Sequence, residues 1–120
     1  MRNQPKYNLF KNSSYALKGL RDLVQNETSF KVELLLIVAA IPVIFILQVG
    51  LVEKLLLFVT LMGIPLAEAI NSAIERIVDL VTLDYHELAG RAKDLGSCAV
   101  LISVVIFLIT WGSVLASVIF

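Results

Sequence analysis

The chain of 120 residues is strongly apolar: 58% of its residues are hydrophobic, 17% are charged, and its mean hydropathy is +0.87. One small water-soluble domain cannot hide so many apolar side chains, so we expect the lipid bilayer to be its main solvent. Ten Lys and Arg balance ten Asp and Glu, which argues against nucleic acid as a partner, because nucleic acid binds basic surfaces. The lone Cys98 excludes an internal disulfide and is expected to be a small buried hydrophobic residue.

An amphipathic pattern occupies residues 8–26. Apolar side chains recur there at helical spacing, opposite a polar face that contains Lys11, Lys18, Asp22 and Gln25. The pattern predicts a helix that lies along the cytoplasmic surface of a membrane. An ordinary amphipathic helix packed on protein would show the same pattern.

Three hydrophobic spans are expected, at about residues 32–49, 54–83 and 97–119. Each is close to or longer than the roughly 20 residues that a helix needs to cross the hydrocarbon of a bilayer. Pro42 is expected to bend the first span. The third has no charged residue from Cys98 to the C-terminus, and we expect its Trp111 to anchor it near a membrane interface.

The two connections between the spans differ in charge. Asp84 to Ser97 is polar and is interpreted as a loop or a helix end in water, whereas the short first connection has Lys54 as its single basic residue. By the positive-inside rule, the N-terminus and the second connection are cytoplasmic. The remaining basic residues support this orientation, because they precede the first span or lie around the second connection: Arg2, Lys6, Lys11, Lys18, Arg21, Lys31, Arg76, Arg91 and Lys93. The sequence therefore predicts one all-α membrane domain over residues 1–120.

The second span carries a polar face. Glu68, Asn71, Glu75 and Asp79 fall within an arc of roughly 80° on a helix that turns about 100° per residue. A carboxylate in hydrocarbon is costly unless it is paired, hydrated or bound to a cation, so acids inside a span are functional candidates. A structural polar network between helices is the alternative.

Two further acids, Glu27 and Glu33, bracket the start of the first span. Glu33 is interpreted as a boundary residue, and Glu27 lies at a depth where it and Glu75 could share a divalent cation. Phosphoryl transfer needs carboxylates that hold Mg²⁺, a cation for the phosphate oxygens and a base near the acceptor hydroxyl. The second connection supplies the complementary groups His86, Arg91 and Lys93. A conventional P-loop fold is excluded, because the chain has no GxxxxGK[ST] motif.

The segment Glu68-Ala-Ile-Asn71-Ser-Ala-Ile-Glu75, followed by Asp79 and by Asp84-Tyr-His-Glu-Leu-Ala-Gly-Arg-Ala-Lys-Asp94, resembles the small bacterial membrane diacylglycerol kinases. The similarity runs from Tyr15 to Trp111. It implies a homotrimer of three-span protomers, each with an N-terminal surface helix, in the bacterial cytoplasmic (inner) membrane. Neighbouring subunits would share each active site, on the cytoplasmic side.

The same resemblance implies roles for individual residues. Glu68 would be the general base that takes the proton from the lipid hydroxyl, and Asn71 would orient that carboxylate or the substrate. Glu27 and Glu75 would bind Mg²⁺, with ATP as co-substrate. Contacts to the nucleotide are implied for Tyr15, Glu27, Glu75, Asp79, Asp84, Tyr85, His86, Lys93 and Asp94. Contacts to the lipid substrate are implied for Ser14, Arg21, Glu33, Glu68, Ser97 and Trp111.

Two positions depart from the family pattern. An N-terminal arginine of the family aligns near Asn8, so its role is unfilled or passes to Lys6 or Lys11, and Leu17 replaces a tryptophan. These differences concern the finer substrate contacts rather than the chemistry.

The predicted function is therefore a lipid kinase that transfers the γ-phosphate of ATP to diacylglycerol, giving phosphatidic acid. A sibling of the same fold that phosphorylates undecaprenol is the nearest alternative, although the stretch from Tyr85 to Arg91 looks more like the diacylglycerol type. A small proton-coupled transporter could also use a glutamate in the membrane as its carrier site. A purely structural membrane subunit is the remaining possibility.

Overall fold

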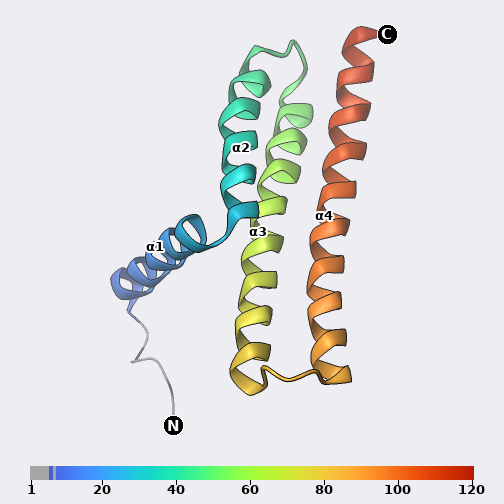
Figure 1. The fold of residues 1–120 in the computed structure, drawn as a ribbon. Helices are drawn as coiled ribbons and strands as arrows, with labels where there is room; N and C mark the ends of the chain where they lie inside the picture. The colour runs from blue at the N-terminus through green and yellow to red at the C-terminus, as the bar shows by residue number, and fades with distance from the viewer. Residues whose placement is uncertain (1–5, 7) are drawn as a thin grey trace.

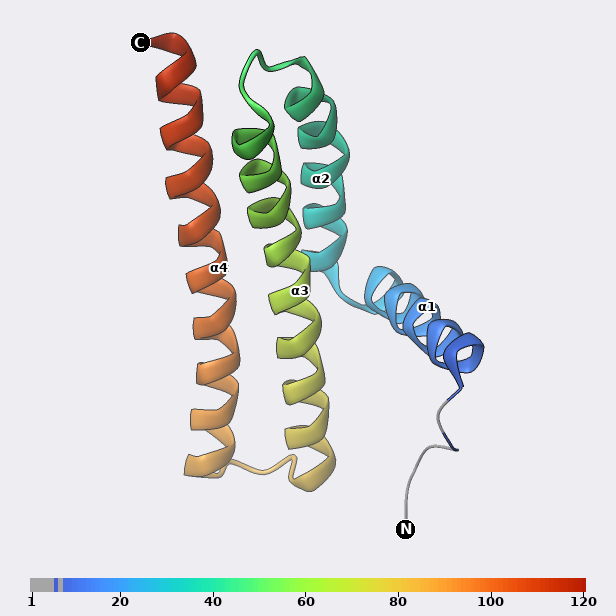
Figure 2. The same cartoon turned by 180° about the vertical axis from the view of Figure 1, so that it is seen from behind.

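The computed structural model describes residue 6 and residues 8–120, and within that part it contains four helices and no strand. These are α1 (Leu9–Asn26), α2 (Thr28–Ile46), α3 (Leu51–Val81) and α4 (Glu87–Ile119). Helices α2, α3 and α4 run side by side with α3 in the middle, and α1 leaves the row at an angle (Figures 1 and 2). The predicted all-α architecture is confirmed, and α2, α3 and α4 are long and apolar enough to cross a membrane.

Side-chain caps define where two of the helices begin. Asn8 Oδ1 accepts hydrogen bonds from the backbone N–H groups of Phe10 and Lys11, at 3.0 and 3.2 Å. Asn8, which stands near the position of the family's arginine, therefore has a local role as the N-cap of α1. His86 Nδ1 accepts from Leu88 N at 3.1 Å and caps α4 in the same way.

Helix α1 buries no residue on the rest of the protomer. Leu9, Phe10 and Leu17 are all more than half exposed. Packing on this protomer therefore does not explain the apolar face of α1, and a position on the membrane surface stays the prediction for it.

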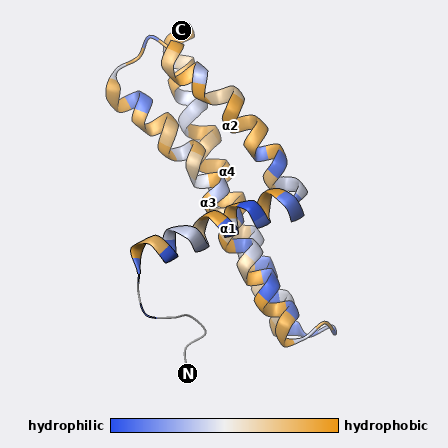
Figure 3. Ribbon diagram, turned by 90° about the vertical axis from the view of Figure 1, so that its left-hand side faces the viewer, coloured by the Kyte–Doolittle hydropathy of each residue, from blue (hydrophilic) through white to orange (hydrophobic). Residues whose placement is uncertain are grey.

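The helix lengths place one end of the row outside the hydrocarbon. At about 1.5 Å per residue, the 19 residues of α2 span about 28 Å, whereas α3 and α4 span roughly 46 and 50 Å. A bilayer's hydrocarbon is about 30 Å thick. Helices α3 and α4 continue past the start of α2, and hydrophilic residues gather on this extension and on α1 (Figure 3). We call this extension the polar end.

The structure decides two expectations about the connection and the third span. Residues 87–97 form the first turns of α4, which agrees with a helix end and not with a loop, and the turn between α3 and α4 is confined to residues 82–86. Cys98 is exposed on α4 rather than buried. Helix α2 begins and ends a few residues before the range 32–49 that the sequence predicts for the first span.

The apolar core lies where the three long helices meet, around the fully buried Leu57 and Leu61 of α3. Trp111 is 8% exposed there, and its indole N–H donates to Leu57 O at 3.1 Å. The polar group of Trp111 thus has a backbone partner inside the protomer and its ring packs against Phe107, while its position near a membrane interface stays a prediction. Its implied contact to the lipid substrate stays a prediction.

We expect Leu61→Ala to lower the free energy of unfolding by about 2–5 kcal/mol, because it leaves a cavity at the centre of the core. Unfolding in detergent, followed by circular dichroism, measures this change. Leu80→Ala is the matched control on the same helix, since Leu80 is 86% exposed. Equal unfolding midpoints for the two variants would contradict the position of Leu61 in the core.

Candidate functional site

The predicted polar face lies on α3 and crosses into the polar end. Asn71 is buried, Glu68 and Glu75 are half-buried, and Asp79 is exposed. Exposure therefore increases along this face. It is enclosed near the level at which α2 begins, and it is open near the turn that follows α3. One set of contacts lies within α3, and two others tie α3 to α2 and α4.

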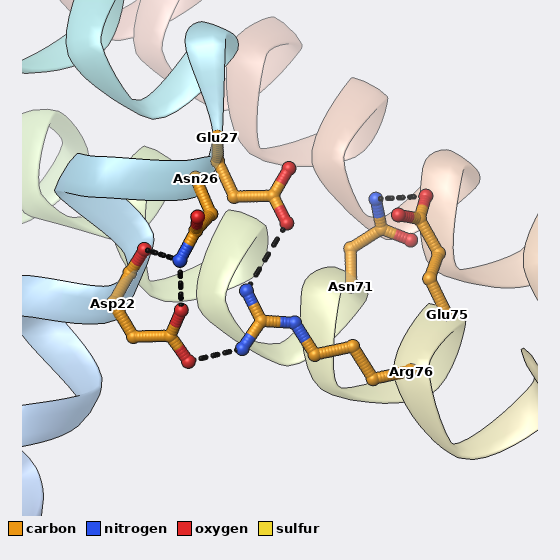
Figure 4. A network of polar contacts seen from close by, with 6 residues as sticks. All are labelled: Asp22, Asn26, Glu27, Asn71, Glu75 and Arg76. Atoms are coloured by element: carbon orange, nitrogen blue, oxygen red, sulfur yellow. Dashed lines mark hydrogen bonds and ion pairs between the residues drawn. The ribbon is translucent and has the colours of Figure 1, made fainter. Parts of the chain in front are cut away.

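The first set joins Asn71 to Glu75. Asn71 Nδ2 donates to Glu75 Oε1 at 3.2 Å, one helical turn away (Figure 4). Asn71 Oδ1 is buried without a hydrogen-bond partner among the described residues. Asn71 was predicted to orient Glu68 or the substrate, whereas the contact that its amide makes here is to the predicted metal ligand.

The second set brings together Glu33 on α2 and Glu68 on α3. The two carboxyl groups lie close enough for their charges to interact, and Glu33 Oε2 is buried without a hydrogen-bond partner in the described part of the chain. Two facing carboxylates repel unless a proton or a cation lies between them. The predicted base therefore has a second carboxyl group beside it, contributed by α2.

The third set joins α3 to α4 through an ion pair between Lys93 Nζ and Asp79 Oδ1, at 2.7 Å. Both side chains are nearly half exposed, and exposed pairs contribute little to stability, so Lys93 can exchange this partner for a phosphate. A cleft of about 370 Å³ lies beside the pair, at the turn between the helices. Its lining includes five of the predicted nucleotide-binding residues: Asp79, Asp84, Tyr85, His86 and Lys93.

The remaining predicted site residues are distributed over α1 and α4. Tyr15 lies on α1, with Lys18 Nζ 5.7 Å from the centre of its ring. The other four are exposed on these two helices: Ser14, Arg21, Asp94 and Ser97. The structure of one protomer does not gather them at the cleft.

Arg76 connects α1 to α3 in a way that the sequence did not indicate. Its guanidinium pairs with Asp22 through Nη1 and with Glu27 Oε1 through Nη2, the latter at 3.4 Å (Figure 4). Asn26 Nδ2 also donates to Asp22. Opposite charges on α1 and α3 were visible in the sequence, but the distance between the two helices was not.

Glu27 and Glu75 do not share a site within one protomer. Glu27 faces Arg76, whereas Glu75 faces Asn71 (Figure 4). In the described part of the chain, no group of three or more His, Cys, Asp or Glu side chains could hold a metal ion. Their chemistry still fits Mg²⁺, which is usually held by one or two protein carboxylates together with substrate phosphates.

We expect Arg76→Gln to loosen α1 and to leave the core unchanged. The hydrogen bond from Arg76 lowers the pKa of Asp22 below its ordinary value of 3.8. The ion pair therefore stabilises the folded state fully above pH 3.8, and this contribution is lost as the pH falls through the lowered pKa. Hydrogen exchange at neutral pH should become faster across residues 9–26. Arg91→Gln is the control, since Arg91 forms no ion pair with the described residues. Equal exchange in both variants would contradict the role of Arg76.

Three helices that can span a bilayer, with carboxylates, an amide and a lysine gathered where two of them leave the apolar region, define a multi-pass membrane protein with a polar site at one end. The sequence profile of the family described as prokaryotic diacylglycerol kinase matches residues 14–115. The chain belongs to this family, which confirms the resemblance found in its motifs.

Individual relatives cover nearly the whole chain. A diacylglycerol kinase of Escherichia coli (strain K12) is 41% identical over 103 residues, which are 86% of this chain and 84% of the relative. A diacylglycerol kinase of Haemophilus influenzae is 38% identical over 107 residues, covering 89% and 91%. An undecaprenol kinase of Bacillus subtilis is 31% identical over 97 residues, covering 81% and 79%.

Proposed function

We propose that this protein is a lipid kinase that transfers the γ-phosphate of MgATP to the primary hydroxyl of diacylglycerol, giving phosphatidic acid, at the cytoplasmic face of the bacterial inner membrane. One observation carries the proposal. The cleft at the turn between α3 and α4 is lined by acidic, aromatic and basic side chains, and its Lys93 is also close enough to Glu75 for their charges to interact. A phosphate in this cleft would lie beside the carboxylates of α3.

The position of the site along α3 suits one substrate that lies in the membrane and a second that arrives from water. Glu68 lies beside Glu33, close to where α2 begins its apolar run, whereas Asp79 and Lys93 lie further along the polar end. A lipid hydroxyl at the membrane boundary can reach Glu68 while MgATP arrives from water. An apolar groove of about 500 Å³ between α1 and α3 offers walls for acyl chains, with Leu20, Leu23, Phe30, Met62 and Leu66 among its lining residues.

In this reaction, each polar residue of the site has its own role. Glu68 accepts the proton of the lipid hydroxyl as the hydroxyl oxygen attacks the γ-phosphorus, while the bond from that phosphorus to the bridging oxygen breaks and ADP leaves. Lys93 leaves Asp79 and compensates charge on the phosphate oxygens. Asn71 holds one oxygen of Glu75 in place, so that Glu75 and Glu27 can present oxygen ligands to Mg²⁺. A Mg²⁺ ion held by these two carboxylates would neutralise charge on the phosphate oxygens.

We also propose that three copies of the chain assemble. Glu27 and Glu75 have different partners within one protomer, so a shared ion needs Glu27 from one copy and Glu75 from its neighbour. Glu68 and Glu75 are only half-buried in a single protomer, and a neighbouring protomer would enclose them. The mass of the detergent-solubilised protein, with bound detergent subtracted, should equal three chains.

The decisive experiment is transfer of radiolabel from the γ-phosphate of ATP to lipid, with purified protein and Mg²⁺ in detergent. We expect faster turnover with diacylglycerol than with undecaprenol. The 31% identity to an undecaprenol kinase keeps the polyprenol as the second candidate, and faster turnover on it would reverse the choice of lipid. No transfer to either lipid, combined with loss of substrate uptake in Glu68→Gln, would indicate a transporter instead.

A further inference from the structure

Helices α3 and α4 approach each other closely at Gly96, which is buried. A Cβ atom built on Gly96 would overlap the side-chain oxygen of Asn71 and would lie 3.3 Å from Asn71 Cγ. The chain has no glycine with positive φ among its described residues, so the requirement at Gly96 is for space and not for an unusual backbone conformation. The side chain that occupies this space is that of Asn71, which belongs to the polar face of α3.

Asn71 has little freedom in this position. It is 8% exposed, its NH₂ group donates to Glu75 Oε1 at 3.2 Å, and its oxygen is buried without a partner. The Gly96 hydrogen that occupies the position of a Cβ atom points at Asn71 Oδ1. The amide therefore fills the gap beside Gly96 with its oxygen and uses its nitrogen to hold the carboxylate.

We propose that Gly96 is a positioning residue for the polar face, because its missing side chain leaves the room in which the Asn71 amide turns its nitrogen toward Glu75. This inference rests on the proposed function, in which Glu75 is a ligand of Mg²⁺. Gly96 lies two residues after Asp94 and directly before Ser97, both of which are implied to contact substrates. One segment of α4 would then carry substrate contacts and also set the orientation of a metal ligand on α3.

Substitution by alanine separates this role from a role in folding. Alanine forms helix more readily than glycine, so Gly96→Ala does not weaken α4 itself. The atom in the way is the end of the Asn71 side chain, whereas the nearest other atom, Ile74 Cδ1, is at an ordinary contact distance of 3.6 Å. The amide gives way by rotating, and in doing so it loses the hydrogen bond to Glu75.

The test measures Mn²⁺, which prefers the same oxygen ligands as Mg²⁺, by electron paramagnetic resonance in the presence of a non-hydrolysable ATP analogue. We expect Gly96→Ala to raise the dissociation constant of Mn²⁺ by about 10- to 100-fold, as for loss of an outer partner of a metal ligand. The Mg²⁺ concentration for half-maximal transfer should rise similarly, with an unchanged KM for diacylglycerol. Gly63→Ala and Gly112→Ala are matched controls on α3 and α4, because a Cβ at either position meets nothing within 4 Å in the protomer. They should bind Mn²⁺ as wild type does.

Gly96→Ala with wild-type Mn²⁺ binding, or with a lower kcat at unchanged metal dependence, would overturn the proposal. If that variant fails to fold, the same substitution in an Asn71→Ser background decides the matter. Asn71→Ser removes the overlapping oxygen, so adding Gly96→Ala to it should change Mn²⁺ binding no further, and a further loss would contradict the mechanism. Wild-type protein that binds Mn²⁺ but transfers no phosphate would refute the proposed function, while the comparison of variants would still decide the role of Gly96.

Discussion

Glu68→Gln is expected to lower phosphate transfer to lipid by about 10²- to 10⁴-fold, because glutamine cannot accept the proton of the attacking hydroxyl. The substitution keeps the shape of the side chain, so binding of MgATP and the unfolding midpoint should stay near wild type. Turnover measured at saturating lipid and nucleotide, together with a nucleotide-binding titration, separates the loss of chemistry from a loss of binding.

Glu53→Gln is the matched control for this change. Glu53 lies on the same helix at the opposite end, is exposed, and is not part of the polar face. Wild-type turnover in Glu68→Gln would remove the base from the proposed mechanism. The neighbouring carboxyl group offers a specific replacement: if Glu33→Gln loses turnover while Glu68→Gln retains it, Glu33 is the base and Glu68 is not.

The contacts within one helix followed from the sequence. A spacing of four residues puts Asn71 and Glu75 on neighbouring turns of one face, and the structure joins them by a hydrogen bond. The apolar runs likewise predicted three long helices, because the length and composition of a segment determine whether it can cross hydrocarbon. These are local properties that do not depend on how the helices pack.

The contacts between helices did not follow, since they depend on the rotation and register of each helix against its neighbours. The sequence contains Gly96, Arg76 and Asp22, but nothing in it places Gly96 against Asn71 or Arg76 between α1 and α3. Trp111 illustrates the same limit. An indole N–H can donate a hydrogen bond at a membrane interface or to a buried carbonyl, and only the packing of α4 against α3 shows that its acceptor is Leu57 O. The arrangement of the polar residues along α3 was therefore predictable from helical spacing, whereas their contacts with α1, α2 and α4 were not.

Glu75→Gln is expected to raise the Mg²⁺ requirement by at least about 100-fold, which is the upper end of the cost of losing an outer partner of a metal ligand. A neutral amide is a weaker ligand for a hard cation than a carboxylate, and the contact with Asn71 Nδ2 also loses its charge. Transfer measured over a range of Mg²⁺ concentrations should be partly restored at high Mg²⁺, unlike that of Glu68→Gln. Glu53→Gln again serves as the control, and an unchanged Mg²⁺ dependence in Glu75→Gln would exclude Glu75 as a ligand.

Mixed assemblies test where the second ligand comes from. Within one protomer Glu27 faces Arg76, so the proposed ion needs Glu27 of one copy and Glu75 of the next. We expect Glu27→Gln and Glu75→Gln to be nearly inactive alone and to regain part of the activity when the two variants are unfolded, mixed and reassembled. A Glu75→Gln copy still supplies Glu27 and a Glu27→Gln copy still supplies Glu75, so some interfaces in a mixed trimer hold both carboxylates. If both ligands came from the same copy, every site would lack one of them, and mixing would restore nothing.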